Sequence, residues 1–237
     1  YTHEEVKEIV AYAAERHIEV IPEIEMLGHS VAALCAYPEF SCNPSASRQV
    51  WTNGGVSTDV VNVANPKAVQ FYKDIVDELC EIFPGRYFHI GGDECPTDAW
   101  KSNAQCQQMY KEKGFTDYRQ IQSWFTNEIS KYIASKGKRT IVWNESITAG
   151  GSDLDMVKEY DPVIMCWYPC QGGAQKAAQL GLDAIITEYH GSSSAASGAG
   201  GYYINRKQSN LPTEPDGAGA GDDKGYSLDF RYREWSR

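Results

Sequence analysis

Short apolar segments that alternate with amphipathic helices constrain the fold of this chain more than any other feature. The apolar segments, rich in Val, Ile, Phe and Trp, read as strands at 18–24, 87–90, 140–143, 163–167 and 184–187. Helical periodicity with capping signals fills the stretches between them, at 2–16, 66–83, 97–113, 117–136, 154–160 and 173–180. Strands that are apolar on both faces and separated by helices indicate a parallel α/β sheet with helical crossovers.

A (β/α)8 barrel of the TIM type is the architecture that this alternation favours, because polar or aromatic residues follow each strand, as barrel active sites require. An open doubly wound sheet is the alternative, but it normally concentrates its site at one switch point. Five strands are fewer than the eight of a complete barrel. We therefore expect residues 1–237 to be part of a single catalytic barrel domain that covers about strands 3 to 7. The N-terminal strands and the last strand would lie outside this chain.

Composition excludes several classes of function. The net charge of −10 argues against a nucleic-acid partner, which requires a basic surface. We expect no membrane span, because no apolar run reaches the ~20 residues that one needs. The seven cysteines are odd in number and form no CxxC motif, so a disulfide framework is not expected, and the histidines are too scattered for a zinc site of recognisable spacing. The 15 Tyr and 6 Trp suit a carbohydrate site, where flat rings stack on sugar faces.

The run from His89 to Glu94, His-Ile-Gly-Gly-Asp-Glu, places two carboxylates side by side at a strand end. The two glycines allow a sharp turn and a close approach of a ligand. On an extended segment, Asp93 and Glu94 would point in different directions and serve different roles. Glycoside cleavage uses such a pair, since one group protonates the leaving oxygen while the other stabilises positive charge. Repulsion between neighbouring carboxylates raises one pKa toward the value that a general acid needs. An Asp-Glu pair alone is more often a solvated loop feature.

These motifs resemble those of the family-20 glycoside hydrolases, the β-N-acetylhexosaminidases. The run from His89 to Glu94 is similar to the family's His-x-Gly-Gly-Asp-Glu signature at the end of the fourth barrel strand. The run from Glu23 to His29, Glu-Ile-Glu-Met-Leu-Gly-His, resembles a second family motif at the third strand, Glu-Ile-Asp-Met-Pro-Gly-His. The resemblance covers nearly the whole chain, with its motifs in the family's order.

The resemblance implies a substrate-assisted, retaining mechanism, in which the acetamido oxygen of the substrate attacks the anomeric carbon. Asp93 would hold and polarise the acetamido group, while Glu94 would protonate the leaving group and then activate water. His29, together with the acidic Glu25 of its motif, would support Glu94, and His89 would have a supporting role within its strand. The resemblance implies no metal and no organic cofactor.

The resemblance also assigns the sugar-binding residues. Trp143 and Trp167, after the fifth and sixth barrel strands, would form walls around the acetamido methyl group. Tyr203 and Asn205 resemble a Tyr-Leu-Asp segment whose tyrosine donates to the acetamido carbonyl, although Tyr202 or Tyr189 are alternatives for that tyrosine.

The chain departs from the family pattern in several places. Glu25 and Leu27 replace the Asp and Pro of the second motif, and Asn205 replaces an Asp that contacts sugar hydroxyls. The family's first-strand arginine has no counterpart here. Its eighth-strand Trp-x-Glu has none either, because Glu234-Trp235 has the opposite order. These departures affect the position of the His29 hydrogen bond and the preference for sugar hydroxyls.

The function that follows is exo-acting hydrolysis of terminal β-linked N-acetylglucosamine or N-acetylgalactosamine, with a glycan or oligosaccharide as partner. Three alternatives stay open: a relative that releases a disaccharide or a modified amino sugar, a sugar-binding pseudoenzyme, and a barrel enzyme that uses Asp93 and Glu94 to hold a divalent metal. By family analogy alone, we expect a periplasmic or secreted location.

Overall fold

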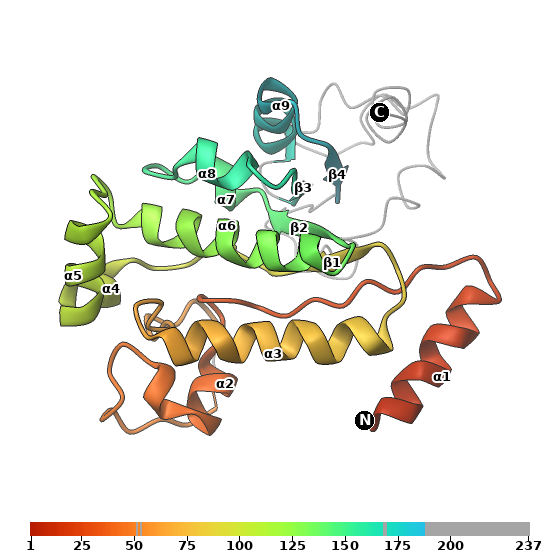
Figure 1. Ribbon diagram of the computed structural model, residues 1–237, viewed down its shortest axis with the longest axis horizontal. Helices are drawn as coiled ribbons and strands as arrows, with labels where there is room; N and C mark the ends of the chain where they lie inside the picture. Colours follow the sequence, from red (N-terminus) through yellow and green to blue (C-terminus); the bar gives the residue numbers. More distant parts are fainter. Residues whose placement is uncertain (51, 53, 168–169, 188–237) are drawn as a thin grey trace.

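The computed structural model describes residues 1–50, 52, 54–167 and 170–187, which form a parallel sheet backed by helices (Figure 1). The strands are β1 (Tyr87–His89), β2 (Arg139–Trp143), β3 (Val163–Cys166) and β4 (Ala184–Ile186). They pair in the order β1-β2-β3-β4, and every pairing is parallel. This order follows the chain without a reversal, as it does in the wall of a barrel. A doubly wound sheet would reverse at a switch point.

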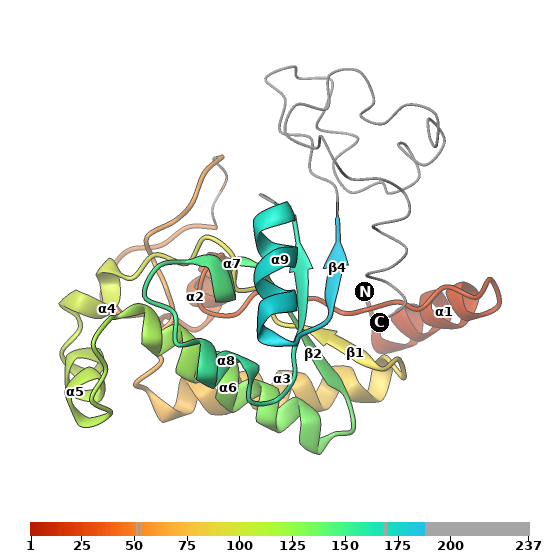
Figure 2. The same cartoon turned by 90° about the horizontal axis from the view of Figure 1, so that it is seen from above.

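The crossover helices lie on one side of this sheet. They are α3 (Pro66–Ile82), α6 (Arg119–Ser135), α8 (Leu154–Lys158) and α9 (Cys170–Leu180). Figure 1 shows them stacked in that order, and in Figure 2 all four again lie on the same side of the strands. Helices on a single side are what a barrel wall requires, whereas a doubly wound sheet carries helices on both faces. The sequence prediction of strands alternating with helices is therefore confirmed over the described residues.

The first predicted strand, at 18–24, is reduced to an isolated parallel bridge between Glu23 and His89. The Ile24 N–H donates to the His89 carbonyl at 3.1 Å, and the His89 N–H donates to the Pro22 carbonyl at 3.0 Å. Pro22 has no N–H, so it cannot continue a regular ladder at this point. The segment still runs beside β1 as a fifth strand position. The helix before it, α1 (His3–Ala14), begins with the predicted capping box of Thr2 and Glu5.

The single helix predicted over 97–113 is two helices, α4 (Asp98–Ser102) and α5 (Ala104–Glu112). Asn103 separates them. Its side chain caps α5 by accepting the Cys106 N–H at 3.0 Å, and its amide nitrogen donates to the Cys42 carbonyl at 3.0 Å. Asparagine is a strong N-cap residue, so the break has a local cause in the sequence. Three short elements were not predicted: α2 (Val31–Ala36), η1 (Pro38–Phe40) and α7 (Glu145–Thr148).

The hydrophobic core lies between the strands and the crossover helices. Phe88 of β1, Val142 of β2 and Ile164 of β3 are fully buried and pack in one cluster with Phe125 and Ile129 of α6. Six cysteines within the described residues are free thiols: Cys35, Cys42, Cys80, Cys95, Cys106 and Cys166. Within the described part of the chain, the helices are too short or too polar to cross a membrane.

Candidate active site

The segment that leaves β1 carries the predicted carboxylates on a tightly coiled turn. Gly91, Gly92 and Glu94 have φ angles of 68°, 105° and 44°. The expectation of an extended segment with alternating side chains is therefore wrong. At Gly91 a Cβ atom would lie 2.0 Å from Oε2 of Glu25, so only glycine fits both the backbone angle and the space. A left-handed conformation at the non-glycine Glu94 is uncommon, and such outliers gather at functional sites.

Two side chains of α6 donate hydrogen bonds to carbonyl groups of this turn. The amide nitrogen of Gln122 donates to the Gly92 carbonyl at 2.8 Å. The guanidinium of Arg119 donates to the Cys95 carbonyl at 2.5 Å and to the Gln122 side-chain oxygen at 2.8 Å. Sequence reasoning missed both residues, because neither belongs to a recognisable motif and their helix gave no sign of which face meets the turn.

The loop that carries His29 packs directly on the same turn. A Cβ atom at Gly28 would lie 3.2 Å from the Cα of Cys95 and 3.3 Å from the Asp93 carbonyl, so the absence of a side chain lets the two backbones approach. The Ser30 hydroxyl donates to the Gly28 carbonyl at 2.8 Å. Leu27 has a φ of 83°, which the ring of proline cannot adopt. A proline at this position would therefore require a different local backbone.

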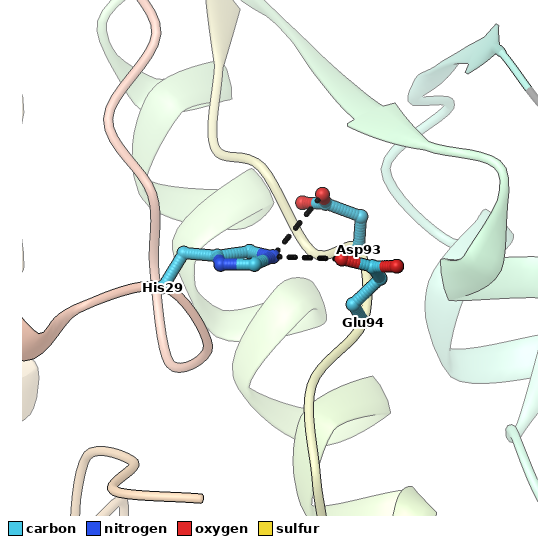
Figure 3. A group of neighbouring side chains, drawn as sticks. All are labelled: His29, Asp93 and Glu94. Carbon is cyan, nitrogen blue, oxygen red and sulfur yellow. Dashed lines mark ion pairs between the residues drawn. The ribbon is translucent and has the colours of Figure 1, made fainter. Parts of the chain in front are cut away.

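His29, Asp93 and Glu94 meet in the centre of the site, and Figure 3 shows the histidine ring pointing between the two carboxylates. Its Nε2 lies 3.4 Å from Oδ2 of Asp93 and 3.4 Å from Oε2 of Glu94. The Asp93 side chain is 17% exposed and that of Glu94 is 44% exposed. Asp93 is thus partly buried, while Glu94 faces solvent. The His29 imidazole lies equally close to both carboxylates.

Glu25 lies near the carboxyl groups of Asp93 and Glu23. The supporting role that the resemblance assigns to Glu25 together with His29 stays a prediction. Burial raises the pKa of Glu25 to about 9, and the neighbouring Asp93 and Glu23 carboxylates add to the rise. A carboxyl with such a pKa is protonated at neutral pH and can donate a hydrogen bond. Glu25 is therefore a neutral acid near Asp93.

His89 is almost fully buried and contacts Gly91 and Trp143. Its Nδ1 accepts the Gly91 N–H at 2.9 Å, and its ring packs on Trp143 with 4.8 Å between ring centroids. Burial lowers the pKa of His89 to about 3. The 3.4 Å contact between its Nδ1 and Oε1 of Glu23 is therefore not an ion pair, because that nitrogen carries no proton. The supporting role expected for His89 stays a prediction.

Each predicted tryptophan is held by a glutamate that the sequence analysis did not assign to the site. The Trp143 indole donates to Oε1 of Glu23 at 2.8 Å, and the Trp167 indole donates to Oε1 of Glu145 at 2.8 Å. Burial raises the pKa of Glu145 to about 7, with smaller contributions from Asp93 and Glu94. Burial likewise raises the pKa of Glu23, although the indole hydrogen bond opposes this rise.

The central three residues could also hold a metal ion. One ligand atom each of His29, Asp93 and Glu94 can be chosen so that all three lie within 4.8 Å of one another. One imidazole and two carboxylates match the ligand number of catalytic zinc sites, which keep a further position for water. The same groups can act on a substrate directly, because a carboxyl that faces solvent beside a histidine is placed for proton transfer.

Two predicted substrate-binding residues, Tyr203 and Asn205, lie outside the described residues. The same is true of Tyr189 and Tyr202, the alternatives for the acetamido-binding tyrosine.

Comparison with known proteins agrees with this geometry. The model of the glycosyl hydrolase family 20 catalytic domain matches residues 1–227. A β-hexosaminidase of Porphyromonas gingivalis is 39% identical over 217 residues, which are 91% of this chain and 25% of that protein. A lacto-N-biosidase of Bifidobacterium bifidum is 31% identical over 186 residues, which are 77% of this chain and 16% of that protein. The chain thus spans a quarter or less of the length of either protein.

A crystal structure of a β-N-acetylhexosaminidase superimposes with a TM-score of 0.72 and 31% identity, over 80% of this chain and 40% of that one. Together with the unreversed strand order, this likeness identifies the sheet as part of a (β/α)8 barrel. The family match, the barrel wall and the paired carboxylates at the end of β1 lead to one conclusion: this chain belongs to glycosyl hydrolase family 20.

Proposed function

We propose that the protein containing this chain removes terminal β-linked N-acetylglucosamine or N-acetylgalactosamine from glycans. The observation that carries the proposal is the meeting of Asp93, Glu94 and His29 at the carboxyl end of β1. Barrel enzymes place their catalytic groups at this end of the strands. The two tryptophans at the ends of β2 and β3 supply flat apolar surfaces of the kind that bind a sugar ring and its acetyl group.

The exposure of the two carboxyls suggests their roles. Glu94 is the more exposed, so it can reach the leaving group, protonate its oxygen and later take a proton from water. Asp93 is set deeper, so it can orient the acetamido N–H and stabilise the positive charge that develops near the anomeric carbon. The attacking atom is the acetamido oxygen of the substrate, which gains an intramolecular advantage.

Release of a disaccharide is the second candidate function. The likeness to the Bifidobacterium bifidum lacto-N-biosidase is the observation that favours it. The catalytic geometry would be the same, and the difference would lie in the space for a second sugar at the non-reducing side. Parallel assays use an aryl glycoside of N-acetylglucosamine and one of a disaccharide whose terminal sugar is not an N-acetylhexosamine. They separate the two candidates, since an exo-acting enzyme that removes one N-acetylhexosamine cleaves only the first.

The test is hydrolysis of an aryl N-acetyl-β-glucosaminide by the intact protein and its Glu94→Gln variant. Loss of a positioned general acid lowers the rate by roughly 10²–10⁴-fold, and by less when the leaving group is already good. Glu81→Gln on the exposed surface of α3 is the matched control and should retain full activity. An aryl β-glucoside, which lacks the acetamido group, should not be cleaved. An inert wild-type protein, or a Glu94→Gln variant with normal rates, would refute the proposal.

A further inference from the structure

Two glutamates far apart in the sequence make the same contact with the two tryptophans of the site. Glu23 accepts the Trp143 indole N–H and Glu145 accepts the Trp167 indole N–H, each at 2.8 Å. An indole N–H in a largely apolar setting needs an acceptor, and the direction of that bond fixes which way the ring faces. These two contacts therefore determine the orientation of the flat surfaces that border the site.

Trp167 is held at its backbone as well as at its ring. The backbone N–H of Trp167 donates to the side-chain oxygen of Asn144 at 3.1 Å, and Asn144 is the residue immediately before Glu145. The Asn144 N–H in turn donates to the Met165 carbonyl at 2.9 Å. Consecutive residues at the end of β2 thus fix both the position and the rotation of the tryptophan that follows β3.

The Glu145 carboxylate is an energetically unfavourable acceptor for the Trp167 indole. Its Oε2 atom is buried and has no hydrogen-bond partner among the described residues. Asp93 and Glu94 lie close enough to disfavour its negative charge. Burying a charged or polar atom without a partner opposes folding. A neutral side chain would avoid the repulsion, but a carboxylate gives the indole a stronger, charge-assisted bond that restrains the ring more firmly.

We propose that Glu23 and Glu145 are positioning residues that set the selectivity of the site for the N-acyl group, by fixing the Trp143 and Trp167 rings. This inference rests on the proposed function, in which the two rings border the acetyl group. A rigid wall admits a methyl group and rejects a longer acyl chain, whereas a ring that can rotate makes room. Hydrophobic pockets discriminate one methylene by roughly 10–200-fold, so the effect is large enough to measure.

The test measures binding, so that it does not depend on hydrolysis. Dissociation constants for N-acetylglucosamine and N-propionylglucosamine are determined by titration calorimetry with the intact wild-type protein, Glu145→Ala and Glu145→Gln. We expect the wild type to prefer the acetyl compound by roughly tenfold or more. Glu145→Ala should lose most of this preference. Glu145→Gln keeps an acceptor for the indole and should retain most of it.

Glu159→Ala is the matched control, because Glu159 accepts a side-chain amide bond from Asn127 at 2.7 Å on the exposed surface, away from the tryptophans. It should bind like the wild type. Glu23→Ala tests the second contact in the same way, through Trp143. Near-ultraviolet circular dichroism of each variant reports whether the tryptophans lose their fixed surroundings, which a change confined to the overall charge would not cause.

The proposal is overturned if Glu145→Ala keeps the wild-type preference, if Glu145→Gln loses as much as Glu145→Ala, or if the wild type binds neither ligand. Failure of the proposed function looks different. A protein that binds the acetyl compound selectively but does not cleave the aryl N-acetyl-β-glucosaminide would refute hydrolysis and leave the positioning role of the two glutamates intact.

Discussion

We expect Gly91→Ala to destabilise the fold more than Gly114→Ala, although the two glycines have almost the same backbone conformation. Their φ angles are 68° and 67°. At Gly114 a new Cβ would have no heavy atom within 4 Å, whereas at Gly91 it would lie 2.0 Å from Oε2 of Glu25. Gly114→Ala therefore measures the cost of the left-handed backbone alone, and the comparison isolates the contact with Glu25.

The magnitude follows from these two contributions. Placing an L-residue in the left-handed region costs about 1–2 kcal/mol, and both variants share this cost. In Gly91→Ala the Glu25 carboxyl must also shift out of the way of the new methyl group, and overpacking of this kind costs about 1–3 kcal/mol. Gly91→Ala should thus lower the free energy of unfolding by about 2–5 kcal/mol, against about 1–2 kcal/mol for the control.

Urea unfolding followed by tryptophan fluorescence measures both values. The double variant Gly91→Ala with Glu25→Asp supplies a further check, since the aspartate is shorter by one methylene and withdraws the carboxyl from the new methyl group. It should be more stable than Gly91→Ala alone. Equal destabilisation by Gly91→Ala and Gly114→Ala, or a double variant with no recovery, would refute the role assigned to the contact between Gly91 and Glu25.

Three further predictions concern protons, metal ions and a helix cap. The pKa of Glu25 is raised from 4.5 to about 9, so its contribution to stability is present below pH 4.5 and is lost as the pH rises through about 9. Glu25→Gln should therefore flatten the pH dependence of the free energy of unfolding, measured with urea at pH 5, 7 and 9. An unchanged pH dependence would contradict this prediction. Treatment with a chelator should leave hydrolysis unchanged, and a loss that Zn²⁺ restores would instead make His29, Asp93 and Glu94 metal ligands. Asn103→Ala should lower the free energy of unfolding by about 1–2 kcal/mol, because it removes the cap of α5 and the bond to Cys42; an unaltered urea midpoint would contradict this.

Local rules predicted the strands, the crossover helices and the residues that stand at the strand ends. The strands at β1 to β4 each appear where short apolar runs placed them. Two errors also had local causes that were present in the sequence. Pro22 lacks the N–H that a regular strand at 18–24 would need, and Asn103 is a capping residue in the middle of an expected helix. In both places a single residue outweighed the hydrophobic pattern around it.

Contacts between distant segments lay beyond such rules. Glu23 and Trp143 are 120 residues apart, and neither the period of a strand nor the signals of a cap connects them. Arg119 and Gln122 are ordinary helix residues until the turn at Gly92 and Cys95 meets their face of α6. The motifs identified which residues gather at the site. They did not show that Glu25 lies against Gly91, because that depends on how closely the turn at Gly91 approaches the loop before His29.

The crowding of carboxyl groups connects these observations. Glu23, Glu25 and Glu145 surround the Asp93 and Glu94 pair, and burial among these groups raises the pKa of all three. Such crowding opposes folding, and the protein relieves it by keeping a proton on Glu25 and by directing indole N–H groups at Glu23 and Glu145. Under the proposed function, the remaining negative charge would lie beside the place where a glycosidic transition state becomes positive. Such an arrangement would be more complementary to that transition state than to a neutral sugar, which is what catalysis requires.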